Sequence, residues 1–156
     1  MRDKIAELLK LEHEELYAEL VRATKAGGKT GEHAEALTKV LHDHFVKEEE
    51  FALPPIGFIA ALARGKVDQK MRSVFAMTDR LKVELPKMRR EHRAIISALK
   101  KLTATANREK KAEPARFAEK LMLHAKREEK VLYPAAMLVS EYLSLRLGRS
   151  QFDGYC

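Results

Sequence analysis

The sequence contains an internal repeat, and this repeat limits the folds open to the chain. The segments HFVKEEEFALP at 44–54 and HAKREEKVLYP at 124–134 share His, Glu, Glu and Pro at equivalent positions, 80 residues apart. The dipeptide Glu-His also recurs, at 12–13 and at 91–92. Each half therefore carries one histidine followed by a His-x-x-x-Glu motif. Such self-similarity predicts two copies of one structural unit.

Each unit reads as a pair of helices. Apolar residues recur at a spacing of three and four, and no strand-like alternation persists. We expect helices at about 3–26 and 31–52, and a last one from Pro114 to about Leu147. The third helix begins near Asp68, a suitable N-cap, and either kinks at Pro86 or breaks there into a lead-in helix and a helix at about 85–107. The apolar segment IGFIAALARG at 56–65 adds one or two turns.

Two helical hairpins predict an all-α, up-down-up-down four-helix bundle. The first turn is expected at Gly27 and Gly28, and the second helix should stop at Pro54 and Pro55. We assign residues 1–147 to the bundle and 148–156 to an irregular C-terminal tail.

Polar residues interrupt the apolar stripe that each helix should turn toward the core. Every stripe contains a histidine, and two contain a glutamate as well. The midpoint between His13 and His44 is 28.5, at the first turn, and that between His92 and His124 is 108, in the loop at 107–113, so each pair is expected to face across its own hairpin. The stripes are Ile5, Leu9, His13, Leu16 and Leu20; Leu37, Leu41, His44, Glu48 and Phe51; Leu85, Met88, His92, Ile95, Leu99 and Leu102; and Phe117, Leu121, His124, Glu128, Val131 and Ala135.

Burial of these polar groups predicts a metal centre. A buried carboxylate without a partner costs several kcal/mol, against a net stability of about 5–15 kcal/mol. Divalent cations would neutralise it, and imidazole with carboxylate suits iron, manganese or zinc. A single histidine in a stripe is more often a satisfied core residue, but a duplicated set is more specific. The predicted ligands are His13, His44, Glu48, His92, His124 and Glu128, whereas His33 and His42 are expected at the surface.

The motifs EH at 12–13, HFVKEE at 44–49, LPKMRREH at 85–92 and HAKREEKVLYP at 124–134 resemble the hemerythrin-like, or HHE cation-binding, domains. The resemblance implies a non-haem di-iron centre, oxo- or hydroxo-bridged, in a hemerythrin-like bundle. His13, His44, His92 and His124 would be terminal ligands, and Glu48 and Glu128 would bridge the two irons. Manganese or zinc would also suit these ligands.

The chain departs from the oxygen-carrying members of that family. Those have a fifth histidine on the third helix, where this chain has Met88 four residues before His92 and Ile96 four residues after it. They also have an aspartate five residues after the last histidine, where this chain has Glu128 at four. The missing histidine leaves coordination positions open and favours reactivity toward small molecules. Bacterial di-iron proteins linked to nitric-oxide stress and iron–sulfur repair are more similar.

Three functions stay open on the sequence. The first is binding or sensing of O2 or NO. The second is a di-iron oxidoreductase, acting as a peroxidase, NO reductase or iron oxidase on peroxide, NO or O2. The third is iron storage or donation for iron–sulfur cluster repair. No catalytic residue beyond the metal ligands is predicted, and a redox partner or an acidic protein partner fits each function.

Charge, hydropathy and cysteine content argue against nucleic-acid-binding, membrane-spanning, secreted and disulfide-linked proteins. The net charge is +7, but the Lys and Arg residues are scattered among Glu residues, and no nucleic-acid signature occurs. No apolar stretch is long enough to span a membrane, and the start lacks a secretory signal, so a cytoplasmic location is expected. The single cysteine, Cys156, permits neither an internal disulfide nor a cysteine metal cage.

Two lesser features have two interpretations each. Tyr17 lies one turn after His13, so it is either a hydrogen-bond donor near the metals or a core tyrosine. Glu49 and Glu129 recur in both halves. They either orient ligand histidines or are exposed helix charges, and the second interpretation is favoured.

Overall fold

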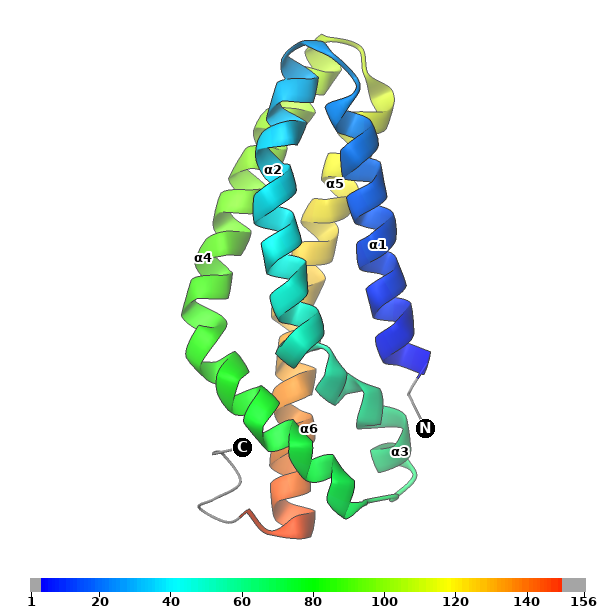
Figure 1. Cartoon of the computed structure of the whole chain (residues 1–156), viewed down its shortest axis with the longest axis vertical. Helices are drawn as coiled ribbons and strands as arrows, with labels where there is room; N and C mark the ends of the chain where they lie inside the picture. The colour runs from blue at the N-terminus through cyan, green and yellow to red at the C-terminus, as the bar shows by residue number, and fades with distance from the viewer. Residues whose placement is uncertain (1–3, 150–156) are drawn as a thin grey trace.

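Our computed structural model describes residues 4–149, which contain no strand. Four long helices form an antiparallel bundle (Figure 1): α1 (Lys4–Thr24), α2 (Gly28–Lys47), α4 (Ser73–Arg108) and α5 (Ala112–Arg127). The turns α1–α2 and α4–α5 lie at the same end of the molecule (Figure 1). The predicted all-α, up-down-up-down bundle is therefore confirmed.

The two hairpin turns are linked by hydrogen bonds at that end. Gly27 and Gly28 have φ of 75° and 60°, the left-handed region that favours glycine. The Glu109 carboxylate accepts hydrogen bonds from the backbone N–H of Thr30 and from its hydroxyl, at 2.9 and 2.5 Å. Lys111 Nζ donates to the carbonyls of Ala26 and Gly27. A carboxylate thus meets the start of α2, and an ammonium meets the end of α1, as helix dipoles favour.

A π-helical turn begins at each glutamate of the repeat. These turns are η1 (Glu48–Ala52) and η4 (Glu128–Leu132), which end α2 and α5. The backbone N–H of Leu53 donates to the carbonyl of Glu48 at 2.8 Å, a bond that spans five residues. Single π turns of this kind occur frequently at functional sites.

The second π turn corrects one predicted face. Val131 was expected in the core, but its side chain is 55% exposed, and Ala135 is only half-buried. Tyr133 and Ala136 are buried instead, at 1% and 0% exposure. The wide turn adds a residue between successive inward positions, so the three-and-four spacing fails after Glu128.

The connection between the hairpins is helical, as predicted. It consists of η2 (Pro54–Phe58), α3 (Ile59–Ala63) and η3 (Gln69–Arg72), whose N-cap Asp68 accepts from the backbone N–H of Lys70. The chain does not break at Pro86, which lies inside α4. Figure 1 shows that α4 bends, the expected effect of a proline within a helix.

Two apolar clusters lie on either side of the level at which the histidines sit. Leu20, Leu37 and Leu102 are among the residues packed toward the hairpin turns. Phe51, Leu81 and Met88 pack toward the opposite end, which α6 (Tyr133–Leu147) extends. The histidine level is thus enclosed above and below by apolar side chains.

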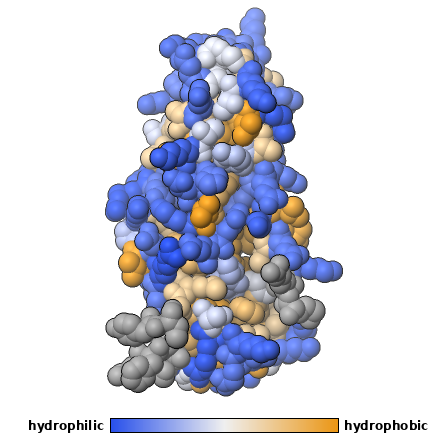
Figure 2. All heavy atoms as spheres, viewed as in Figure 1, coloured by the Kyte–Doolittle hydropathy of each residue, from blue (hydrophilic) through white to orange (hydrophobic). Residues whose placement is uncertain are grey.

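The surface is mainly hydrophilic on the face seen in Figure 2, with strongly apolar atoms in separate spots and paler apolar atoms grouped in the lower part of the view. Among residues 4–149, no helix has the length and apolar character needed to cross a membrane. Gly148 and Arg149 follow α6 without helical structure. The remainder of the predicted tail, Cys156 included, lies outside the described residues.

Candidate metal centre

The six predicted ligands meet in the interior of the bundle. His13, His44 and His92 are each 2% exposed, and His124 is 4% exposed. Glu48 and Glu128 are 0% and 1% exposed. α1, α2, α4 and α5 each contribute one histidine, and the two π turns contribute the glutamates.

Their polar atoms form two overlapping groups. One group contains His13 and His124, the other contains His44 and His92, and both include Glu48 and Glu128. In each group the four ligand atoms lie within 4.8 Å of one another. Each group offers two imidazole nitrogens and two carboxylate oxygens, a donor set that suits iron, manganese or zinc.

The histidine pairs differ from those expected. We expected His13 to face His44, and His92 to face His124, across the hairpins. Instead, the Nε2 atoms of His44 and His92 lie 2.7 Å apart, and the rings of His13 and His124 meet with centroids 5.2 Å apart. Each group therefore draws one histidine from each hairpin.

Four further carboxylates bind the histidines from outside, each through Nδ1. Since a carboxylate is an acceptor, each Nδ1 donates, and this fixes the tautomer that leaves the inward Nε2 free to bind a metal. The exposed-charge interpretation of Glu49 and Glu129 is therefore wrong. The pairs are His13 with Glu49 at 3.2 Å, His44 with Glu91 at 2.8 Å, His92 with Glu129 at 2.9 Å and His124 with Glu12 at 3.1 Å.

Charge in the cluster is concentrated. Burial by itself would lower the pKa of His13 and of His92, but the neighbouring carboxylates of Glu128 and Glu48 favour the protonated rings and raise the pKa of both to about 10. Burial would raise the pKa of Glu48, but its three histidine neighbours hold it well below the usual range. In the absence of a cation, protons on the histidines neutralise the glutamates, so a metal would bind by displacing protons.

The hydrogen bonds leave two inward atoms unsatisfied. Glu48 Oε2 and His124 Nε2 are buried and have no hydrogen-bond partner among the described residues. Glu48 Oε2 lies 3.2 Å from His13 Nε2, and His124 Nε2 lies 2.6 Å from Glu128 Oε1. Neither of these two contacts has the geometry of a hydrogen bond. Buried polar atoms without partners are costly, and both atoms belong to residues of the cluster. The residues present therefore fit a metal centre.

The sequence pattern does not predict one buried polar side chain at the cluster, that of Tyr133. The Tyr133 hydroxyl, 1% exposed, donates a hydrogen bond to Glu48 Oε1 and lies 3.4 Å from His92 Nε2. Burial and the neighbouring carboxylates raise the pKa of this hydroxyl far above its usual range, so it remains protonated. Tyr133 is five residues after Glu128. A residue at that spacing points into the core only when a π turn lies between the two, as η4 does here. Tyr17, the tyrosine whose position one turn after His13 suggested a contact with the metals, is half-buried, and its ring centroid lies 5.9 Å from that of the exposed His42.

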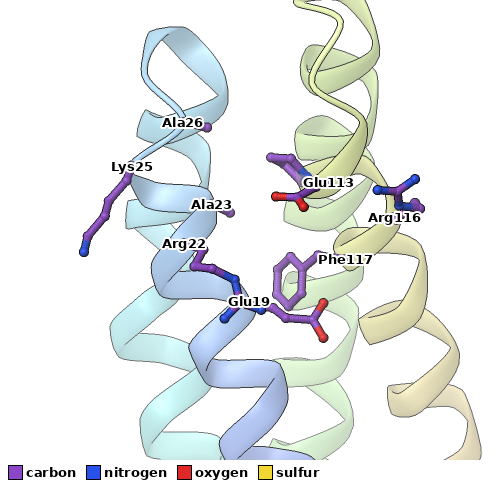
Figure 3. Close-up of a pocket in the computed structure, with 9 residues that line it drawn as sticks. Glu19, Arg22, Ala23, Lys25, Ala26, Glu113, Arg116 and Phe117 are labelled. Carbon is purple, nitrogen blue, oxygen red and sulfur yellow. The ribbon is translucent and has the colours of Figure 1, made fainter.

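Two pockets differ in their relation to the cluster. One of about 300 Å³ lies between α1 and α2 and is lined by His13, with Tyr17, Phe45 and Glu49 also in its wall. The other, also about 300 Å³, lies near the hairpin turns between α1 and α5 (Figure 3), where Arg22 and Arg116 are among its lining residues. The second pocket touches none of the six predicted ligands.

Fold and cluster together define a helical-bundle protein with a buried histidine–carboxylate site for cations. The profile of the hemerythrin HHE cation binding domain matches residues 4–136. The chain therefore belongs to this family, as its motifs predicted. No curated protein and no solved structure matches the chain significantly.

Proposed function

We propose that the cluster holds two metal ions and that the protein binds or senses a small diatomic ligand, O2 or NO, at this centre. His13 and His124 would hold one ion, His44 and His92 would hold the other, and Glu48 and Glu128 would contribute to both. The observation that carries the proposal is the sharing of both glutamates by two otherwise separate groups of ligand atoms.

Iron is the metal we propose. Imidazole and carboxylate also suit manganese and zinc, but the chain's motifs resemble those of di-iron members of its family. Each ion would receive two nitrogens and two oxygens from the chain. An ion that prefers octahedral coordination would keep about two positions for a further ligand.

A reduced di-iron pair supplies electron density to O2 or NO. The chain's own residues provide the surroundings for this chemistry. The outer carboxylates fix the ring orientation and tautomer of the histidines, as second-sphere groups do at metal sites. The apolar clusters above and below exclude water, which strengthens electrostatic interactions inside the cluster.

A di-iron oxidoreductase acting on O2, peroxide or NO is the second candidate. The Tyr133 hydroxyl favours it, because a protonated donor in contact with the cluster is a source of hydrogen bonds to a reacting ligand. Iron storage or donation is less well supported. All six ligands are at most 4% exposed, and four outer carboxylates hold the histidines in place, as suits a retained cofactor rather than a cargo.

Rapid mixing of the reduced, iron-loaded protein with O2 or NO tests the proposal. Reversible binding predicts a persistent spectral species that disappears when the gas is removed. Repeated turnover with consumption of peroxide or NO would support the oxidoreductase instead. The His42→Ala variant, altered at an exposed histidine two residues from His44, should behave as the wild type.

A further inference from the structure

The repeat makes the two metal positions equivalent in their ligands but not in their surroundings. Leu53 and Tyr133 occupy equivalent places, each five residues after a repeated glutamate and directly after a π turn. Both are buried, at 2% and 1% exposure. Only the second carries a hydroxyl. The cluster therefore has a hydroxyl hydrogen-bond donor on one side only. An exact repeat would place such a donor on both sides or on neither.

Tyr133 lies against the position formed by His44 and His92. Its ring stacks on that of His92, with centroids 5.8 Å apart and an interplanar angle of 15°. Its hydroxyl oxygen is 3.4 Å from His92 Nε2, the atom that faces the metal position, and it donates to Glu48. The hydroxyl is therefore at the edge of this position, within reach of a small ligand bound there.

An apolar ring covers the other position. Phe45 stacks on His13, with centroids 3.9 Å apart and an interplanar angle of 4°, and meets His124 edge-on at 6.0 Å. The equivalent residue in the second half is Ala125, which cannot form this stack. The pocket beside His13 has Phe45 in its wall, together with Glu49, which binds His13 Nδ1.

We infer that the small ligand binds at the position of His44 and His92, where the Tyr133 hydroxyl turns its single proton from Glu48 Oε1 to the ligand once that carboxylate is engaged by metal. Tyr133 is thus a positioning residue that makes one of two like metal positions the ligand site. This inference rests on the proposed function, since it requires a loaded centre. In a buried site, an oriented hydrogen-bond donor interacts more strongly with a ligand than it would in water, so the position beside Tyr133 is preferred.

Vibrational spectroscopy with nitric oxide as the probe tests this inference. The N–O stretching frequency is measured after addition of the gas to the reduced, iron-loaded protein, in H2O and in D2O. The wild type should show an isotope shift, because the exchangeable hydroxyl proton bonds the ligand. In Tyr133→Phe the frequency should rise and the isotope shift should disappear. Tyr17→Phe, altered at the tyrosine that meets His42, should match the wild type.

Iron content and nitric-oxide uptake are measured first, so that two failures can be told apart. A wild type that takes up neither iron nor nitric oxide overturns the proposed function and this inference with it. A wild type that binds both, but shows no isotope shift, overturns the inference alone. An unchanged frequency in Tyr133→Phe does the same. If that variant loses its iron, the comparison of H2O and D2O on the wild type decides the matter.

Discussion

The Nε2 atoms of His44 and His92 lie 2.7 Å apart, although the two residues belong to different hairpins. Two imidazole nitrogens approach this closely when a proton is shared between them or when both are arranged to bind one cation. His13 and His124 are likewise drawn from different hairpins into the other group. A metal at either position would therefore join the two repeats, in the middle of the core.

The pH dependence of stability should differ between metal-free and metal-loaded protein. In the metal-free protein, the pKa of His13 and of His92 is raised from 6.5 to about 10. Their contribution to the free energy of unfolding is therefore complete below pH 6.5 and is lost as the pH rises toward 10. The pKa of Glu48 is lowered from 4.5, so its contribution is lost in acid. We expect the metal-free optimum between about pH 4.5 and 6.5.

Metal should move this optimum upward, because cations compete with protons for the same nitrogens. Thermal unfolding across this pH range, with and without a chelator, measures the shift. Coinciding optima for the two forms would contradict the account.

Loss of one outer carboxylate should weaken metal binding without removing a ligand. In Glu91→Gln, the amide is a poorer acceptor for His44 Nδ1, so the inward nitrogen becomes less basic. We expect the metal affinity to fall by about 10–100-fold, the usual effect of such partners. Competition with a coloured chelator measures it.

Glu50→Gln is the matched control for that variant. Glu50 is 56% exposed and pairs with Arg80. Its substitution should leave the metal affinity unchanged. Equal losses in the two variants would show that general charge, rather than the bond to His44, is responsible.

Much of the fold and site was predictable from the repeat. Four helices, two turns and all six clustered residues follow from apolar spacing and from the recurrence of His and Glu. The pairing across hairpins was not predictable, because distance from a turn gives the level of His13 in the bundle but not its neighbour. The inward place of Tyr133 was missed because a π turn leaves no signal in a three-and-four pattern.

The π turn at Glu128 has a consequence for substitutions. Val131, on the expected core stripe, is 55% exposed, whereas Ala136 is fully buried. Val131→Lys should change the free energy of unfolding by no more than about 0.5 kcal/mol, as surface changes do. Ala136→Lys should lower the melting temperature strongly or prevent folding, because it buries a charge without a partner. If Val131→Lys were the more damaging variant, a regular α-helix would run through this segment.

The contact between the two turns should stabilise the bundle independently of the metal. Glu109→Ala removes the acceptor for the backbone N–H groups of Lys29 and Thr30 at the start of α2. We expect a lower melting temperature and an unchanged metal content. Glu32→Ala, at an exposed residue of the same helix start that pairs with Lys29, is the control and should have little effect. A loss of metal in Glu109→Ala would contradict the independence of the two ends.

Metal content of the purified chain tests the central claim most directly. Protein prepared without added metal, or reconstituted with ferrous iron, should contain about two metal ions per chain. Glu128→Ala should lose at least one of them, since both groups use this carboxylate, while His42→Ala should keep both. A wild type that binds no metal and is equally stable with and without a chelator would contradict the account.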